Sequence, residues 1–189
     1  MSSLKRIHVY GHVSAQPQAI ANLFDAQLAS EIVIESDLAI FAINPAAGID
    51  QKTIDQWQAL SDYQLPRLVI VNELDGSDAD FEDAIMLANR VFDQLVTPYL
   101  VLHSDIGSPI ALISLDDLQI IDYSTKPPTT SASEIEHQEL VAEFREEYLE
   151  EIEGAGENAF AAGLLFPAIP IVISNGLGLD IVKDFINQL

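Results

Sequence analysis

The chain of 189 residues contains no cysteine and only 8 Lys and Arg. Without cysteine, the protein has no disulfide, no thiolate metal ligand and no cysteine nucleophile. The basic residues are outnumbered by 30 Asp and Glu, which gives a net charge of −22. Binding to nucleic acid or to an anionic membrane depends on Lys and Arg, so this charge disfavours both. A protein partner with a basic surface fits the charge better, although many acidic proteins are acidic only for solubility.

The chain also lacks a long, uninterrupted hydrophobic run. Its N-terminal segment MSSLKRIHVYG has a single strand-length apolar run and no signal-peptide core. The longest stretch without a charged residue, NAFAAGLLFPAIPIVISNGLGL, contains two prolines and several glycines, which is typical of a helix end, a turn and a buried strand rather than a membrane span. The four histidines are scattered, so the sequence indicates no metal site and no cofactor. We therefore expect a soluble, cytoplasmic protein.

What the chain does have is a series of apolar, β-branched runs separated by segments of helical periodicity. Near-continuous apolar strands bounded by turn residues are typical of a parallel sheet buried on both faces. The alternation predicts an α/β fold with a doubly wound, mostly parallel sheet. The predicted strands are RIHVYGHV (6–13), LAIFAIN (38–44), RLVIVN (67–72), YLVLH (99–103) and IPIVIS (169–174). The predicted helices of this sheet include 50–63, 78–95 and 178–189.

One region departs from this alternation. Residues 107–124 contain two short apolar runs around an acidic pair, which predicts a hairpin. Residues 134–153 predict an acidic helix with nine Glu, and the side chains expected to face inward are Leu140, Phe144, Tyr148 and Leu149. Because both elements lie between the fourth and fifth strands, we expect an inserted α+β subdomain at about 106–165. The length and apolar content fit a single domain over 1–189.

Several segments resemble parts of a nucleotide site. GHVSAQPQAI (11–20) lies where a strand runs into a helix and resembles the phosphate loop of translation factors, G-H-V-D-H-G-K-T-T. NELD (72–75) resembles the guanine-specificity motif N-K-x-D, and the stretch that follows IPIVIS resembles the S-A-x guanine loop. Taken in order, these segments and the predicted strands cover nearly the whole chain and resemble the G domain of elongation factor G and its ribosome-protection relatives. The resemblance implies a P-loop GTPase type of fold and a ribosome-associated protein.

The phosphate-loop segment lacks the residues that the family's chemistry needs. Gln16, Pro17 and Gln18 stand where the family has a Gly for close backbone approach, a Lys for the β- and γ-phosphates and a Thr for magnesium. Pro17 also removes a backbone N–H, and a proline is favoured in the first turn of a helix. Between Ala29 and Ser36 the chain has only SEIVIE, where the family carries its effector loop, two strands and a D-x-P-G-H segment. The resemblance therefore implies a degenerate G domain with no catalytic residue, and we expect it to lack the family's downstream domains.

The segments that resemble the family's guanine-binding motifs leave two interpretations open. By resemblance, Asn72, Asp75 and Ser174 occupy the positions of a vestigial guanine site, with Asp75 suited to the N1 and N2 donors of guanine. Glu73 replaces the Lys that lies along the nucleoside and places an anion near an anionic ligand, and Asn175 replaces the Ala that follows the serine. The other interpretation is that NELD is a polar strand-to-helix turn kept for its backbone hydrogen bonds.

Two functions are compatible with these residues. The first is a non-catalytic, translation-factor-like domain that acts through protein–protein interaction. The alternative is a weak binder of guanine nucleotide or nucleoside that does not hydrolyse it. We expect the two to differ in whether the groove near Asn72, Asp75 and Ser174 is open or filled by side chains such as Gln16.

The acidic helix 134–153 also has two interpretations. In the family, the inserted subdomain offers a surface to a ribosomal stalk protein, and the glutamates expected to face solvent here are Glu139, Glu143, Glu146, Glu147 and Glu150. A charged helix is also commonly just a solvated face. An unrelated enzyme has no support, because the neighbours His103, Ser104 and Asp105 would point to opposite faces of a strand and cannot form a catalytic triad.

Overall fold

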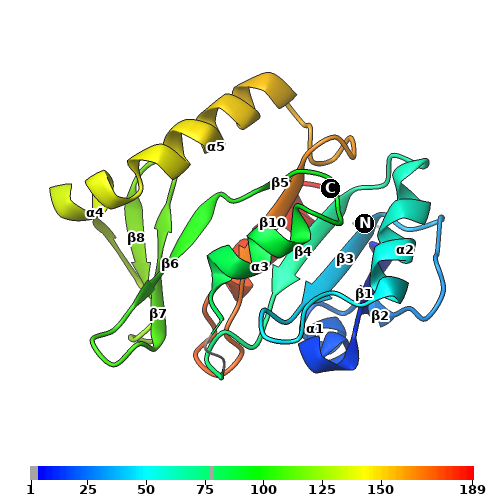
Figure 1. Cartoon of the computed structure of the whole chain (residues 1–189), viewed down its shortest axis with the longest axis horizontal. Coiled ribbons are helices and arrows are strands. Elements are labelled where there is room, and N and C mark those ends of the chain that lie inside the picture. Colours follow the sequence, from blue (N-terminus) through cyan, green and yellow to red (C-terminus); the bar gives the residue numbers. More distant parts are fainter. Residues whose placement is uncertain (1–3, 77–78) are drawn as a thin grey trace.

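The computed structural model describes residues 4–76 and 79–189, and Figure 1 shows two sheets beside each other. The first has six parallel strands in the order β2-β1-β3-β4-β10-β5, and the second has four antiparallel strands in the order β6-β7-β8-β9. The first sheet consists of β1 (Ile7–Gly11), β2 (Gln27–Leu28), β3 (Leu38–Ile43), β4 (Arg67–Val71), β5 (Leu95–Val96) and β10 (Phe166–Pro170). The second consists of β6 (Tyr99–His103), β7 (Pro109–Ser114), β8 (Gln119–Asp122) and β9 (Thr129–Ala132).

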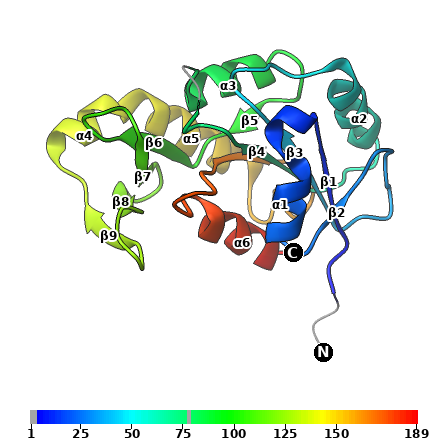
Figure 2. The ribbon, with the colours of Figure 1, turned by 90° about the horizontal axis from the view of Figure 1, so that it is seen from below.

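Helices cover both faces of the six-stranded sheet. Figure 2 shows α1 and α6 on one face and α2 and α3 on the other. The helices are α1 (Pro17–Leu23), α2 (Gln51–Ser61), α3 (Phe81–Ala88), α4 (Ile135–Leu140), α5 (Ala142–Ala155) and α6 (Leu179–Asn187), with a 3-10 turn η1 (Val13–Ala15). Because of this cover every residue of β3 and β4 is buried. The predicted α/β class, with a mostly parallel sheet and an additional α+β part, is confirmed.

The core of the main sheet is built around a group of aromatic rings. The ring of Phe41 on β3 lies 5.0 Å from Tyr10, 5.0 Å from Trp57 and 5.8 Å from Phe92, measured between ring centroids. Trp57 and Phe92 also stack on each other at 4.3 Å. Aromatic pairs at these distances add to the stabilisation that burial of their surface provides. These contacts fix α2 and the segment after α3 onto the same face of the sheet.

The assignment of 99–103 to the parallel sheet was wrong. This run forms β6, which pairs antiparallel with β7 in the second sheet, for example Leu100 with Ile113. The place at the edge of the parallel sheet is taken by the two residues of β5. Pro98 separates the two strands, and a proline cannot donate to a strand ladder. The chain therefore changes sheets at this residue, which an apolar run alone does not indicate.

The predicted helix 78–95 is shorter in the structure, and residue 78 lies outside the described part of the chain. Helix α3 is capped by Asn89, whose side-chain oxygen accepts a hydrogen bond from the backbone N–H of Leu95 at 2.9 Å. That bond turns the chain from the helix into β5. Leu95, the last residue of the predicted helix, is consequently a strand residue.

The acidic segment forms two helices instead of one. Helices α4 and α5 meet at Val141, whose backbone (φ −103°, ψ 4°) departs from helical geometry. Val141 is buried, whereas Leu140 is 75% exposed and Phe144 is 44% exposed. The inward prediction was therefore wrong for Leu140 and Phe144, because the break changes which residues face the core. Tyr148 and Leu149 are partly buried, and Tyr148 packs against the core, as predicted.

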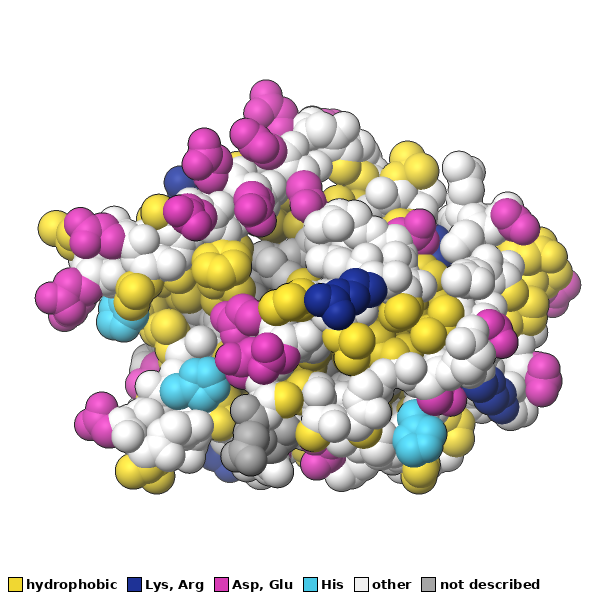
Figure 3. All heavy atoms as spheres, in the orientation of Figure 1, with side chains coloured by type: hydrophobic (Ala, Val, Ile, Leu, Met, Phe, Trp, Pro, Cys, Tyr) yellow, Lys and Arg dark blue, Asp and Glu magenta, His cyan; other side chains and the backbone are white. Residues whose placement is uncertain are grey.

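The predicted exposure of the glutamates on this segment is confirmed. All five are exposed, and we call them the acidic face: Glu139, Glu143, Glu146, Glu147 and Glu150. Figure 3 shows acidic side chains following this segment from end to end. In the described part of the chain the ion pairs are Arg6–Asp37 and Arg67–Asp93, so none of these glutamates is neutralised by a salt bridge there.

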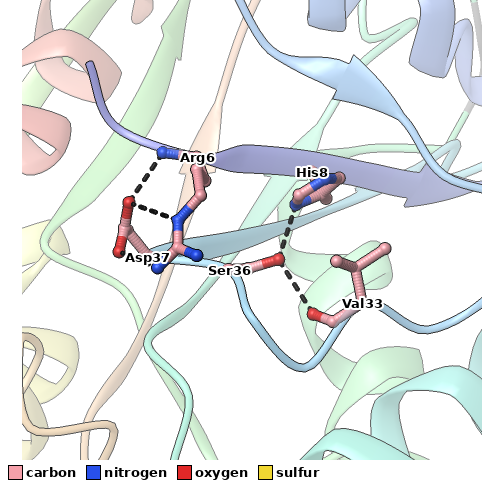
Figure 4. A network of polar contacts seen from close by, with 5 residues as sticks. All are labelled: Arg6, His8, Val33, Ser36 and Asp37. Carbon is pink, nitrogen blue, oxygen red and sulfur yellow. Dashed lines mark hydrogen bonds and ion pairs between the residues drawn. The ribbon is translucent and has the colours of Figure 1, made fainter.

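The short link between β2 and β3 is closed by a polar network (Figure 4). The hydroxyl of Ser36 donates to the backbone oxygen of Val33 at 2.9 Å and also contacts Nδ1 of His8. Because a hydroxyl has one proton, Nδ1 of His8 is the donor in the second bond. Next to it, the carboxylate of Asp37 accepts from the backbone N–H of Arg6 at 2.7 Å and from its guanidinium at 3.2 Å. The network ties the link to β1.

We expect the free energy of unfolding to decrease as the pH is lowered from about 7 to about 5, because of the protonation of His8. Burial of the imidazole, and then repulsion by the Arg6 guanidinium, lowers the pKa of His8 below its ordinary value of 6.5. The unfolded chain therefore takes up this proton first, so the contribution is present above pH 6.5 and is lost as pH falls through the folded-state pKa. Urea midpoints at the two pH values, for the wild type and His8→Gln, measure this. The variant should lose less stability than the wild type, and an equal loss in both would contradict the expectation.

Candidate functional site

The turn between β1 and α1 forms the first half of the candidate site. Gln16 has a left-handed backbone (φ 54°, ψ 51°), and Pro17 is the first residue of α1. Proline is favoured there because the N–H of this position has no partner within the helix. Pro17 is buried, while Gln16 and Gln18 are exposed. The interpretation of Pro17 as a helix-starting residue is confirmed.

Two side-chain amides donate hydrogen bonds to the backbone of this turn. Nδ2 of Asn44, directly after β3, donates to the backbone oxygen of Ser14 at 2.9 Å. Nδ2 of Asn72, directly after β4, donates to the backbone oxygen of Ala15 at 3.0 Å. The hollow that the turn encloses with the start of α2 has no volume for a water molecule. Sequence reasoning missed Asn44, although its place directly after a buried strand, like that of Asn72, was the available signal.

Asn72 is only 2% exposed, and its polar groups are used inside the protein. Besides the bond from its side chain to Ala15, its backbone N–H donates to the backbone oxygen of Ile43 at 3.0 Å. A buried amide is stabilised by such bonds, and losing them leaves a costly unpaired group. The side chain of Asn72 therefore fastens the end of β4 to the turn before α1.

Asp75 and Ser174, unlike Asn72, are exposed and lie together. The hydroxyl of Ser174 donates to the carboxylate of Asp75 at 3.0 Å. The structure thus joins two of the predicted guanine-site residues at the surface, while the third faces the interior. Asn175, at the position where the family has Ala, donates from Nδ2 to the backbone oxygen of Pro109 at 3.1 Å and so links this loop to the second sheet.

Gln16 reaches across to the guanine-side turn. Its Nε2 donates a hydrogen bond to the carboxylate of Glu73, directly after Asn72. Glu73 also has a left-handed backbone, with φ 63°. This bond ties the turn before α1 to the turn after β4.

The described residues contain no group of three or more His, Cys, Asp or Glu arranged to hold a metal ion. Nor does any helix among residues 4–76 and 79–189 have the length and apolar character needed to span a bilayer. His103, Ser104 and Asp105 end β6 and begin a turn, where the Ser104 hydroxyl accepts a hydrogen bond from the backbone N–H of Ser108 at 3.2 Å.

The chain is similar in sequence to elongation factor G-like proteins. It is 28% identical over 167 residues to the elongation factor G-like protein of Mycobacterium tuberculosis. This aligned region covers 76% of this chain and 23% of the relative. It is 32% identical over 82 residues to elongation factor G of Gluconobacter oxydans, covering 43% of this chain and 11% of the relative. With the mitochondrial ribosome-releasing factor 2 of Drosophila sechellia it shares 25% identity over 104 residues, covering 51% of the chain and 15% of the relative.

The fold is also shared with a known structure. The crystal structure of ttk003000868 from Thermus thermophilus superposes with a TM-score of 0.71 at 21% identity, covering 82% of this chain and 26% of that one. No protein-family model matches the chain. The chain spans about a quarter of the length of the elongation factor G-like relative, 23%. It is a distant homologue of elongation factor G-like proteins over most of its own length.

Proposed function

We propose that this homologue of elongation factor G-like proteins is a non-catalytic domain that acts by binding another protein. The observation that carries the proposal is the closed turn between β1 and α1. A phosphate loop binds nucleotide through converging backbone N–H groups, a lysine and a magnesium-binding hydroxyl. Here Pro17, which has no N–H, stands at the position of the lysine, Gln18 at that of the hydroxyl and Gln16 at that of a glycine. The amides of Asn44 and Asn72 hold the turn over a hollow without room for water.

The link between β2 and β3 supports the same proposal. In a GTPase, this region must carry residues that hold magnesium and position the attacking water, and it must change conformation with the nucleotide. In this chain, the link is short, and Ser36 and Asp37 fasten it to His8 and Arg6 on and beside β1. Such a fixed link has neither the residues nor the freedom for GTP hydrolysis.

The acidic face favours a partner with a basic surface. Its exposed glutamates lie on α4 and α5, on the part of the chain predicted as the inserted subdomain at about 106–165. Opposite charge across an interface speeds association and selects the partner. By resemblance to elongation factor G, we propose a ribosome-associated protein as this partner and exclude direct contact with nucleic acid because of the net charge of −22.

A second candidate function is weak binding of guanine or its nucleoside without hydrolysis. It is favoured by the exposed pair of Asp75 and Ser174, whose side-chain oxygens lie 3.0 Å apart on the loops that resemble the family's guanine site. A guanine base would have to displace the Ser174 hydroxyl from the Asp75 carboxylate. Since that carboxylate already accepts a hydrogen bond, the net gain in free energy on binding guanine would be small.

We expect no binding of GTP or GDP at micromolar concentration, with or without magnesium. A hydrogen bond to a charged group is worth about 1.5–3 kcal/mol, and the turn lacks several that a phosphate loop supplies. Titration calorimetry with GTP, GDP and guanosine tests the two candidate functions together. A micromolar isotherm that requires magnesium would overturn the first proposal. Guanosine binding that is lost in Asp75→Asn but does not depend on phosphates would favour the second.

A further inference from the structure

A hollow of about 400 Å³ lies between the end of α5, strand β10 and the C-terminal end of α6, and we call it the α5–α6 hollow. Figure 1 shows the segment after α5 turning back toward β10 beside the C-terminus. Residues of this segment, 156–165, line the hollow together with Pro167 of β10 and Gln188 at the end of α6. Small-molecule sites in proteins have volumes of about 300–1,000 Å³, so the hollow is large enough for a ligand.

The lining of the α5–α6 hollow is mainly apolar and contains three aromatic rings, those of Tyr148, Phe160 and Phe185. The last two meet edge to face, with their ring centroids 5.2 Å apart. None of the described residues that line the hollow is Asp, Glu, Lys or Arg, although these make up 20% of the chain. By contrast, three glutamates line the hollow between α3 and α5. The α5–α6 hollow therefore favours an uncharged ligand, because a charged one would lose water without gaining a counter-charge.

The wall formed by residues 156–165 is fixed by backbone contacts. The N–H of Leu164 donates to the backbone oxygen of Ala159 at 2.9 Å, and the N–H of Gly163 donates to that of Phe160 at 3.0 Å. Gly163 has a left-handed backbone, and a Cβ atom there would overlap the backbone oxygen of Gln64, so this segment packs directly against the turn after α2. A wall that is already in place loses little conformational entropy when a ligand binds.

Two side-chain amides supply hydrogen-bonding groups at the edge of the α5–α6 hollow. Asn158 and Gln188 line it and are exposed. Within the described part of the chain their hydrogen bonds involve the backbone: the oxygen of Asn158 accepts from Ala162 at 3.0 Å, and the N–H of Gln188 donates to Phe185 at 3.1 Å. Because a side-chain amide both donates and accepts, each can orient a polar group of a ligand.

We propose that the α5–α6 hollow binds an uncharged, mainly aromatic small molecule that carries a hydrogen-bonding group. A cavity of about 150 Å³ holds benzene, so a hollow of about 400 Å³ holds a ligand of about 15 non-hydrogen atoms. Its rings would pack against Phe160 and Phe185, and its polar group would face Asn158 or Gln188. This site goes beyond the proposed interaction function and does not depend on it.

The probe is N-phenyl-1-naphthylamine, a neutral aromatic dye of this size whose fluorescence rises in apolar surroundings, titrated with the full chain. Ala161→Trp should weaken its binding by about tenfold or more. Ala161 is exposed and lines the hollow, so an indole there fills the hollow without replacing a buried side chain. The matched control is Ala162→Trp, because Ala162 is the next residue, is exposed and does not line the hollow. This control should change the affinity less than about twofold.

Two further measurements test the folded site and its neutrality. The neutral dye should raise the thermal unfolding midpoint of the wild type and of Ala162→Trp but not of Ala161→Trp, because only binding to the folded chain stabilises it. Anilinonaphthalene sulfonate, which adds a sulfonate to the same ring skeleton, should bind about tenfold more weakly or less. Circular dichroism checks the folding of the variants, and Gln188→Trp fills the hollow from the side of α6 if Ala161→Trp does not fold.

Absence of dye binding to the wild type, or equal binding to Ala161→Trp and Ala162→Trp, would overturn the proposal. So would loss of binding in Phe144→Ala alone, because Phe144 lines the hollow between α3 and α5 and not the α5–α6 hollow. Equal affinity for the neutral and the sulfonated dye would contradict the inference that the ligand is uncharged.

Discussion

Gly178→Ala is expected to lower the free energy of unfolding by about 3 kcal/mol or more, against about 1 kcal/mol for Gly176→Ala. Both glycines lie in the loop between β10 and α6 and have nearly the same left-handed backbone, with φ of +78° and +80°. A side chain at either position therefore has the same conformational cost. The space around the two positions differs.

At Gly178 a Cβ atom would lie 2.0 Å from the backbone oxygen of Pro170 and 3.3 Å from a side-chain carbon of Ile171. At Gly176 no atom lies within 4 Å of it. Because a backbone oxygen cannot rotate away as a side chain does, the loop must separate from β10, and α6 must move with it. Urea unfolding of the two variants, followed by circular dichroism, gives the difference. Equal destabilisation would show that the close approach of the loop to β10 contributes nothing.

Arg67→Ala is expected to lower the free energy of unfolding by about 3–5 kcal/mol, and Arg67→Met by only about 1–2 kcal/mol. Arg67 is 2% exposed, and its guanidinium carbon lies 4.2 Å from the ring centroids of both Trp57 and Phe166. Its Nη1 donates to the backbone oxygen of Trp57 at 3.1 Å and lies 3.4 Å from the carboxylate of Asp93. Burial lowers the pKa of Arg67, against the opposing effect of Asp93.

The two variants separate packing from charge at Arg67. Alanine leaves a cavity between the two rings, whereas methionine fills most of it without the charge. The side chain of Asp93 is 50% exposed, so its charge stays hydrated when the cation is removed. Thermal or urea unfolding measures both variants. If methionine were as destabilising as alanine, the hydrogen bonds and ion pair of the guanidinium, rather than its volume, would dominate.

Hydrophobic patterning predicted β3 and β4 well, whereas the predicted strand 169–174 overlaps β10 (Phe166–Pro170) at only two residues. Residues 38–44 and 67–72 are apolar throughout because helices cover both faces of β3 and β4, and this is what the pattern indicated. The same pattern failed at 99–103, because an apolar strand can be buried in either sheet. The partner of β6 is set by Pro98 and by pairing with β7, neither of which hydrophobicity reports.

The candidate site was predicted less well than the fold. Asn72 directly follows β4, and Asp75 and Ser174 lie in the loops after β4 and β10, but only the last two meet. The inward direction of Asn72 depends on a carbonyl of the β1–α1 turn, which is distant in the sequence. Asn44 has the same role and no motif to mark it. Side-chain contacts between separate loops depend on the sheet topology, and the sequence of a single segment does not reveal that topology.

Strand β10 has a consequence for the order in which the chain can fold during its synthesis. It is inserted between β4 and β5, pairing Ala168 with Val69 and Phe166 with Leu95. Strands β1, β3 and β4 can associate as soon as they leave the ribosome, but the β10 side of β4 then stays open until the whole antiparallel sheet and α5 have been made. An open apolar strand edge is a site of aggregation. The nascent chain therefore exposes an aggregation-prone edge of β4 until β10 has been synthesised and has paired with it.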